Sequence, residues 1–265
     1  SSIFILPVIA ELGLPIVSHG VFSVGPKYGC THHLILNELG HNSNNDHRKI
    51  IERLENKDIG WAYADQSMFN PKLHNLMSLR KQIIKRPVIT TVEVLVKPVS
   101  SKNDMFFTGF VHKPYPPIYL ELSRNAQFDS ATVIRGTEGG IIPSLRQTGK
   151  VHFYHSAGEQ DDSYDVTPDD LGIIQSSRAV DIPEEITRKN TKDKIESKVD
   201  AVDIAKETIK SGISALSGND GPMLSCIQLG AAIVLQRATG DDLGDCSKEA
   251  LRVFKSGAAL KRMKR

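Results

Sequence analysis

A change in hydrophobic period near Pro87 constrains the fold more than any other feature of the sequence. Before Pro87 the apolar residues recur mainly at helical spacing, whereas Val88 to Val96 is β-branched and nearly continuous, as in a strand buried on both faces. Three further strands are predicted at Phe106 to His112, Ala131 to Arg135 and Val151 to Tyr154, with a helix at Ile118 to Asn125. This alternation predicts an α/β fold in which helices flank a mostly parallel central sheet with at least one right-handed crossover.

Apolar periodicity and capping residues predict helices at both ends of the chain. The early helices are predicted at Ile3 to Leu12, Thr31 to Leu39, Arg48 to Glu55, and from Asn70-Pro71 as far as Ile83. A short strand at Pro15 to Val17 leads into a turn-rich loop, and Ser156 to Asp165 is predicted as a second loop. The late helices are predicted at Val202 to Ser211, Pro222 to Thr239, and Lys248 to Ser256 with Ser247 as N-cap.

These elements predict two parts. Residues 1–85 are expected to form the start of the α/β domain and a segment of a small helical subdomain, and residues 86–265 the main α/β domain. The charge-rich residues 181–198 are expected to be an exposed insertion.

Composition narrows the class of protein. With 40% hydrophobic and 24% charged residues the chain is predicted to be soluble, and no apolar run approaches the roughly 20 residues of a membrane-spanning helix. Scattered cysteines favour a reducing compartment, which we expect to be the cytoplasm, or the plastid stroma in a photosynthetic eukaryote. The net charge of +2 does not indicate a polyanion partner, and we interpret the basic tail as a solvated helix end: Lys255, Lys261, Arg262, Lys264 and Arg265. A start at Ser-Ser suggests a fragment or a processed form.

Three segments carry a family resemblance through their order and spacing. Glu11 to Gly29, with its His-Gly loop, Asn70 to Arg80 and Ser130 to Gly140 resemble collinear landmarks of the anthranilate phosphoribosyltransferases. The resemblance implies an α/β phosphoribosyltransferase fold, further N-terminal helices and a homodimer formed through the helical part. It also implies transfer of a phosphoribosyl group from phosphoribosyl pyrophosphate to an aromatic acid, with Mg²⁺ as cofactor, in tryptophan biosynthesis.

The resemblance assigns roles residue by residue. It places phosphate or substrate contacts at His19, Gly20, Ser23, Lys27 and Arg80, the last facing the aromatic acid. The family's Lys, Asn and Arg of the His-Gly loop are replaced here by Ser18, Val21 and Phe22. Its magnesium-binding Asp-Glu pair is replaced by Gly139 and Gly140, with Glu138 one position early. This pattern resembles a divergent branch of the family.

The replaced residues leave a second hypothesis, a non-catalytic paralogue that binds single-stranded nucleic acid or another anionic partner. Its candidate contacts are Lys27, Arg80, Lys81, Lys85, Arg86, Arg135 and Arg146, with Phe22 and Tyr28 to stack on bases; Glu138 is the carboxylate candidate. A third hypothesis is a structural subunit of a larger assembly. Simpler structural roles compete with each site: His19 can cap or pack, and Arg80 can form a salt bridge. His32 and His33 point about 100° apart on a helix, so no metal site is predicted there.

Overall fold

The structure, a computed structural model, describes residues 2–22, 29–83, 88–187 and 200–265, and its strands form two sheets. In the first sheet β1 (Ile16–Gly20) runs parallel to β2 (Trp61–Asp65). The second has the order β3 (Met105–Gly109), β4 (Ser130–Ile134), β5 (Gly149–Tyr154) and β6 (Asp162–Val166). Its β3–β4 pair is parallel, whereas the β4–β5 and β5–β6 pairs are antiparallel. The predicted α/β class is confirmed, with sheets of mixed strand direction.

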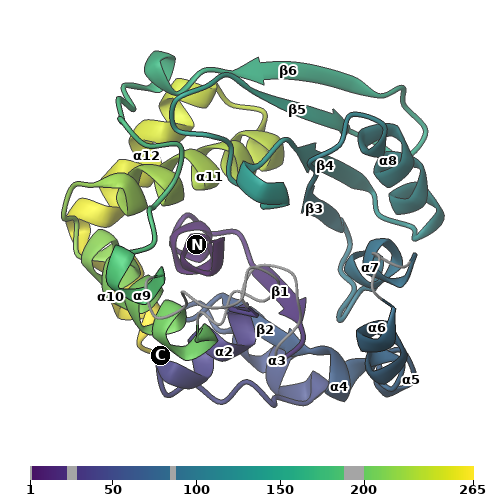
Figure 1. The fold of residues 1–265 in the computed structure, drawn as a ribbon. Helices are drawn as coiled ribbons and strands as arrows, with labels where there is room; N and C mark the ends of the chain where they lie inside the picture. Colours follow the sequence, from purple (N-terminus) through teal and green to yellow (C-terminus); the bar gives the residue numbers. More distant parts are fainter. Residues whose placement is uncertain (1, 23–28, 84–87, 188–199) are drawn as a thin grey trace.

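Helices surround both sheets (Figure 1). They are η1 (Ser2–Phe4), α1 (Ile5–Glu11), α2 (His32–Glu38), α3 (His47–Glu55), α4 (Gln66–Phe69), α5 (Pro71–His74), α6 (Met77–Gln82), α7 (Ile89–Val92), η2 (Glu93–Leu95), α8 (Tyr115–Asn125), η3 (Thr137–Gly139), η4 (Pro168–Leu171), α9 (Glu184–Thr187), α10 (Ala201–Leu216), α11 (Pro222–Thr239), α12 (Leu243–Ser256) and α13 (Ala258–Met263). Within the described residues, none of these helices is both long and apolar enough to cross a membrane.

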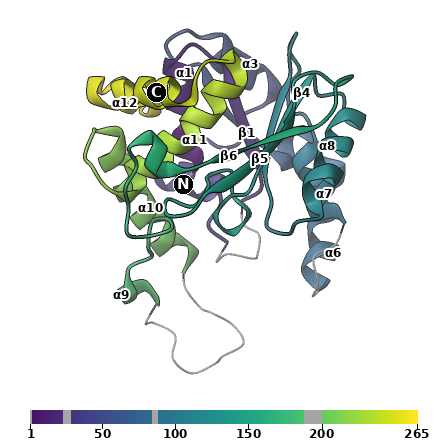
Figure 2. The ribbon, with the colours of Figure 1, turned by 90° about the horizontal axis from the view of Figure 1, so that it is seen from above.

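The four-stranded sheet is covered on both faces, as Figure 2 shows from above. Val133 of β4 packs in one cluster with Leu120 of α8, whereas its neighbour Ile134 packs in another with Leu229 and Ile233 of α11. Successive strand residues point to opposite faces, so an unbroken apolar strand is the sequence that a sheet buried on both faces requires.

The helix α1 lies at the centre of the molecule and is apolar on all sides because it is surrounded (Figure 1). Two glycines let α10 and α11 approach its beginning. A Cβ atom on Gly212 of α10 would lie 2.2 Å from the Phe4 ring, and one on Gly230 of α11 would lie 2.4 Å from Ile5 Cδ1. These positions require glycine for close packing rather than for backbone freedom.

The predicted strand Val88 to Val96 is wrong, because the segment forms α7 and η2. Val88 is 78% exposed, and Leu95 is the buried hydrophobic residue of this segment. The β-branched run prefers a half-buried pleated surface. The segment does lie against both sheets, since the Val94 carbonyl oxygen is 3.3 Å from His19 Nε2 of β1 and Leu95 packs with Val133 of β4, but no strand of the described residues pairs with it. The order of strands deduced from it is corrected accordingly.

Two strands were missed. β2 is a five-residue strand that is buried throughout, and it was hidden among helical segments. β6, which begins inside the predicted loop Ser156 to Asp165 and ends at Val166, is a largely polar edge strand that is only partly buried. Short or edge strands lack the apolar signal on which sequence patterns depend.

Several helix boundaries also differ. The helix expected from Asn70 is broken into α5 and α6, and α10 continues through Gly212 to Leu216. α12 begins at Leu243 with Asp242 as N-cap, so the prediction of Ser247 in that role is wrong: Ser247 is buried inside the helix. Of the predicted insertion 181–198, residues 188 onward lie outside the described residues. The domain division stays a prediction.

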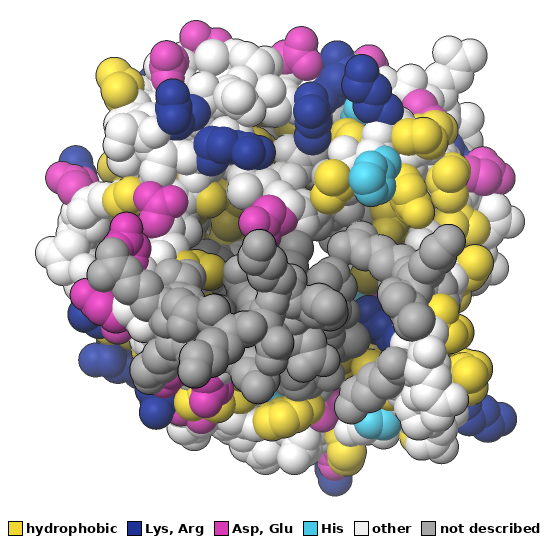
Figure 3. Space-filling view, viewed as in Figure 1, with side chains coloured by type: hydrophobic (Ala, Val, Ile, Leu, Met, Phe, Trp, Pro, Cys, Tyr) yellow, Lys and Arg dark blue, Asp and Glu magenta, His cyan; other side chains and the backbone are white. Residues whose placement is uncertain are grey.

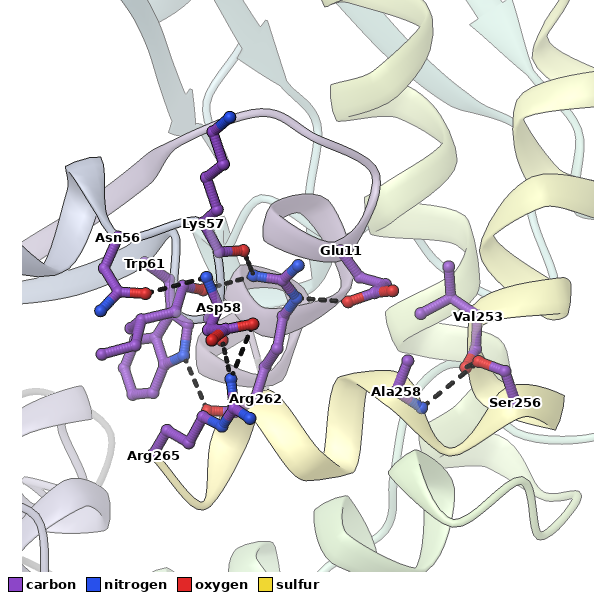
Figure 4. Close-up of polar contacts among 11 residues, drawn as sticks. Glu11, Asn56, Lys57, Asp58, Trp61, Val253, Ser256, Ala258, Arg262 and Arg265 are labelled. Carbon is purple, nitrogen blue, oxygen red and sulfur yellow. Dashed lines mark hydrogen bonds and ion pairs between the residues drawn. The ribbon is translucent and has the colours of Figure 1, made fainter.

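The C-terminal arginines hold the chain end against the β1–β2 region (Figure 4). Arg262 forms an ion pair with Glu11 and donates to the carbonyls of Lys57 at 2.8 Å and Ile59 at 3.1 Å. Arg265 donates to the Asp58 carbonyl at 3.1 Å. The interpretation of the tail as a solvated helix end is therefore wrong for Arg262, whereas Lys255, Lys261, Lys264 and Arg265 are exposed.

Candidate functional site

A pocket of 690 Å³ opens between the first turn of α2, the loop after β4, residues 178–183, and the helices α10 and α11. Its apolar lining includes Ile35, Ile141, Ile142, Ile204 and Met223. Hydroxyl groups come from Ser2, Thr31, Thr137, Thr208 and Ser211, and thiols from Cys30 and Cys226. Its charged residues are Arg178, Glu138, Asp181 and Glu207. The volume is typical of small-molecule sites, as is the mixture of apolar walls and a few polar groups.

The loop after β4 forms one wall and is built from close backbone contacts. A Cβ atom on Gly136 would lie 1.5 Å from the Gly140 carbonyl oxygen, and one on Gly109 of β3 would lie 2.1 Å from the same oxygen. The Thr137 amide donates to the Ile142 carbonyl at 2.8 Å, which closes the loop. Glycine is therefore required where the loop folds back against the end of β3.

This loop carries a single carboxyl group. Glu138 has φ 52° and ψ 27°, the left-handed conformation that non-glycine residues rarely adopt, and it lines the pocket. Gly139 and Gly140, which the resemblance places at the family's Asp-Glu pair, supply no oxygen ligand from a side chain. Within the described part of the chain, no three His, Cys, Asp or Glu side chains are grouped as a metal site. The residues present do not fit a magnesium ion held by a carboxylate pair.

The adjacent histidines of α2 join different networks. His32 lines the pocket, with Nε2 2.9 Å from Ser2 Oγ and Nδ1 3.3 Å from Ser18 Oγ. Burial lowers the pKa of His32 to about 4, so its imidazole is neutral at pH 7. His33 Nδ1 instead lies 3.2 Å from Asp65 Oδ2 at the end of β2. Burial opposes ionisation of Asp65, but the contacts from His33 and the Ser67 amide outweigh it and hold the carboxyl pKa below its usual value.

The predicted residues of the His-Gly loop lie at the end of β1. His19 Nε2 is 3.3 Å from the Val94 carbonyl oxygen, and the ring meets Phe69 edge-on at 5.6 Å. Burial lowers the pKa of His19, so this residue packs as a neutral ring. Neither His19 nor Gly20 is among the residues that line the pocket. Val21 is buried and Phe22 is 54% exposed, whereas Ser23, Lys27 and Tyr28 lie outside the described residues.

Arg80 forms an ion pair with Glu93, and the two side chains are 10% and 15% exposed. Burial raises the pKa of Glu93 in spite of the nearby guanidinium. The pair ties α6 to η2, which agrees with the salt-bridge alternative for Arg80.

Of the other predicted cations, the two that the structure describes in full do not line this pocket. Arg135 and Arg146 are exposed near the ends of β4 and β5. Lys85 and Arg86 lie outside the described residues, as does the side chain of Lys81. The binding roles assigned to these residues and to Glu138 stay predictions.

Sequence reasoning missed Arg178, Thr137 and the hydroxyls of α10. Arg178 stands in a coil without a motif, and Thr208 and Ser211 read as ordinary helix residues. Only the return of the chain past the loop after β4 brings them together, and a single sequence carries no local signal for that.

No family model matches the chain. An anthranilate phosphoribosyltransferase of Aquifex aeolicus (strain VF5) is 24% identical over 254 residues, which cover 96% of this chain and 67% of that protein. An uncharacterized protein of the same organism is 30% identical over 146 residues, or 54% of this chain and 41% of the relative. The chain therefore spans only part of the length of its relatives.

Solved structures show the same likeness. The anthranilate phosphoribosyltransferase of Thermus thermophilus has a TM-score of 0.74 at 18% identity, covering 100% of this chain and 71% of that one. The Saccharomyces cerevisiae enzyme in complex with PRPP and Mg has a TM-score of 0.70 at 16% identity, covering 98% and 66%. The chain is thus a relative of the anthranilate phosphoribosyltransferases and has their fold.

Proposed function

We propose that this protein binds a phosphorylated ribose in the 690 Å³ pocket and does not transfer a phosphoribosyl group to anthranilate with magnesium. The observation that carries the proposal is the loop after β4. Gly139 and Gly140 replace the carboxylates that the resemblance assigns to magnesium, and the loop is closed by backbone contacts with β3. A pentose-phosphate ligand is supported by the hydroxyl-rich lining and by the relatives' substrate, since the yeast enzyme was solved with PRPP.

The lack of positive charge in the His-Gly loop supports the same proposal. Departure of pyrophosphate requires cations or donors close to several phosphate oxygens. Residues 18–22 contain one ionisable side chain, His19, and it is neutral. Ser18, at the family's lysine position, has its hydroxyl 3.3 Å from His32 Nδ1.

The residue assigned to the aromatic acid, which is the phosphoribosyl acceptor, also supports the proposed absence of transfer to anthranilate. The resemblance assigns Arg80 to the carboxylate of the aromatic acid, but Glu93 already neutralises this guanidinium. An anthranilate carboxylate would have to displace the Glu93 carboxylate from Arg80 and leave it largely buried without a partner, which is costly.

Calorimetric titration with ribose 5-phosphate and with phosphoribosyl pyrophosphate, each with and without Mg²⁺, tests the proposal together with an assay for phosphoribosyl anthranilate. We expect at least one of these ribose phosphates to bind with an affinity that EDTA leaves unchanged, and no product above the protein-free control. Magnesium-dependent turnover, or no binding of either ribose phosphate at millimolar concentration, contradicts the proposal.

A homodimer through the helical part is proposed on a separate observation. Large hydrophobic side chains are exposed along residues 68–92: Met68, Leu76, Leu79, Ile83, Val88 and Val92. Figure 3 shows hydrophobic side chains gathered along the edge of the molecule where α6 to α8 lie. Exposed apolar patches of this kind mark association surfaces. Light scattering is expected to give a dimer for the wild type and a monomer for Leu79→Glu; a wild-type monomer would refute this assembly.

Nucleic-acid binding is a second candidate function, favoured by Arg135 and Arg146, which are exposed and form no ion pair with any described residue. Several Lys and Arg side chains stand at the top of the face in Figure 3. Fluorescence anisotropy with a single-stranded oligonucleotide is expected to show binding that weakens steeply with salt, and the substitutions Lys85→Glu and Arg86→Glu are expected to reduce it. Binding that ignores salt, or no binding, excludes this candidate.

A further inference from the structure

The charged groups of the pocket restrict which phosphorylated ribose it can hold. We propose that the pocket selects a sugar phosphate monoester, free or carrying a base, that Arg178 recognises the phosphate, and that no divalent metal takes part. This inference rests on the proposed function and adds the ligand class and the recognising residue.

The backbone of Arg178 is fixed by a hydrogen bond, and its side chain forms no ion pair with any described residue. Its carbonyl accepts the amide of Leu145 at 2.9 Å, and Leu145 is fully buried, so the main chain is anchored at the pocket wall. The residue is exposed and forms no ion pair with any described residue. Because its main chain is fixed and its guanidinium N–H groups are available, Arg178 can donate two parallel hydrogen bonds to one phosphate group.

The other charged side chains that line the pocket are carboxylates, and they repel a ligand with several phosphate groups. Glu138, Asp181 and Glu207 line the same pocket as Arg178, and His32 is neutral, so among the described lining residues carboxylates outnumber cations. Lys210 lies 3.7 Å from Glu207 and offsets that carboxylate in part. A monoester places its charge at Arg178 alone, whereas a pyrophosphate group would bring further negative charge towards these carboxylates. Without metal ions to neutralise it, that repulsion disfavours a diphosphate.

The neutral lining matches a sugar. Thr137 Oγ1 is buried and has no hydrogen-bond partner among the described residues, which is unfavourable unless a ligand supplies one. Sugar hydroxyls both donate and accept, and Thr208 and Ser211 offer complementary hydroxyls. Ile141 and Met223 provide apolar surface for the C–H face of a ring.

Calorimetry on the whole chain tests this inference with five probes: ribose, ribose 5-phosphate, a nucleoside 5′-monophosphate, pyrophosphate, and phosphoribosyl pyrophosphate with Mg²⁺. We expect at least one monoester to bind most tightly, with an affinity that EDTA leaves unchanged. The two monoesters distinguish a free sugar phosphate from a nucleotide.

Two variants and a matched control locate the contact. Arg178→Gln is expected to weaken monoester binding by about tenfold to a hundredfold, because a charge-assisted hydrogen bond is lost, and to leave ribose binding unchanged. Thr137→Val is expected to weaken ribose and monoester binding equally. Arg146→Gln removes another exposed arginine, one outside the pocket, and should bind as the wild type does. Equal thermal midpoints for the arginine variants exclude unfolding as the cause.

The failures are distinguishable. If phosphoribosyl pyrophosphate or pyrophosphate binds more tightly than both monoesters, or if Arg178→Gln binds the monoester like the wild type, this inference is wrong and the proposed function stands. If no ribose phosphate binds the wild type, both are wrong.

Discussion

The substitution Gly136→Ala tests whether the loop after β4 depends on close backbone contact. The added Cβ would lie 1.5 Å from the Gly140 carbonyl oxygen, less than half of an ordinary contact distance, so one strand of the loop must move. Overpacking of this kind costs about 1–3 kcal/mol, and the entropy that alanine removes from the unfolded chain returns only about 0.4–1 kcal/mol. Because the clash is with backbone atoms, we take the upper end of the first range, and subtracting the entropy gain leaves an expected net loss of about 2 kcal/mol in the free energy of unfolding.

Urea denaturation followed by the fluorescence of Trp61 measures this loss, since that indole is buried in the core. Gly158→Ala is the matched control, because its Cβ would meet nothing within 4 Å, and its midpoint should equal or slightly exceed that of the wild type. The loop can relieve the clash only by shifting Glu138 and Thr137, so ligand binding in the pocket should weaken as well. A Gly136→Ala variant with wild-type stability and wild-type binding would show that this loop is not closed by backbone contact.

Other predictions use the charged and titratable groups of the site. Gly139→Asp returns a carboxylate to the loop but at φ +81°, so we expect a loss of about 1–2 kcal/mol in urea denaturation and no gain in Mg²⁺ affinity by calorimetry. Arg80→Met should destabilise the protein by about 3 kcal/mol because Glu93 is left unpaired, and the double substitution with Glu93→Leu should recover part of that loss in a double-mutant cycle. Because the folded pKa of His32 lies near 4, below its unfolded value, stability is full above about pH 6.5 and falls as the pH drops. The loss at pH 5 should be about 2 kcal/mol, and His32→Gln should remove that part of the pH dependence.

The sequence predicted a helix or strand best where the residue pattern matched the same environment along the whole element. α11 was predicted with its observed bounds, because proline at its first position and glycine after its last mark the ends of a helix that is buried along its length. Thr31 was predicted to begin α2, and its hydroxyl does accept the amide of Leu34. In contrast, residues 88–96 have the composition of a buried strand, yet they connect α6 to β3 along the surface. The local preference for strand conformation is not realised there, because no described strand pairs with the segment.

The site was predictable only as far as the resemblance reached. The replaced positions, Gly139 and Gly140, could be named from the sequence, and the structure adds that the loop around them is closed by backbone contact. The partner of Arg80 could not be named, because Glu93 lay in a segment interpreted as a strand. Arg178 and Thr137 are ordinary residues until the fold places them on one pocket.

The segment η1–α1 connects the pocket to the far end of the chain. Ser2, at its start, bonds to His32 on the pocket wall, while Glu11, at its end, pairs with Arg262 of α13. Between them the segment is buried against α10 and α11, where Gly212 and Gly230 admit it closely, so it can move only with those helices. Because Thr208, Ser211 and Met223 of the pocket also belong to α10 and α11, the same packing sets the position of both polar and apolar walls. The core that stabilises this fold is therefore also what preorganises the pocket.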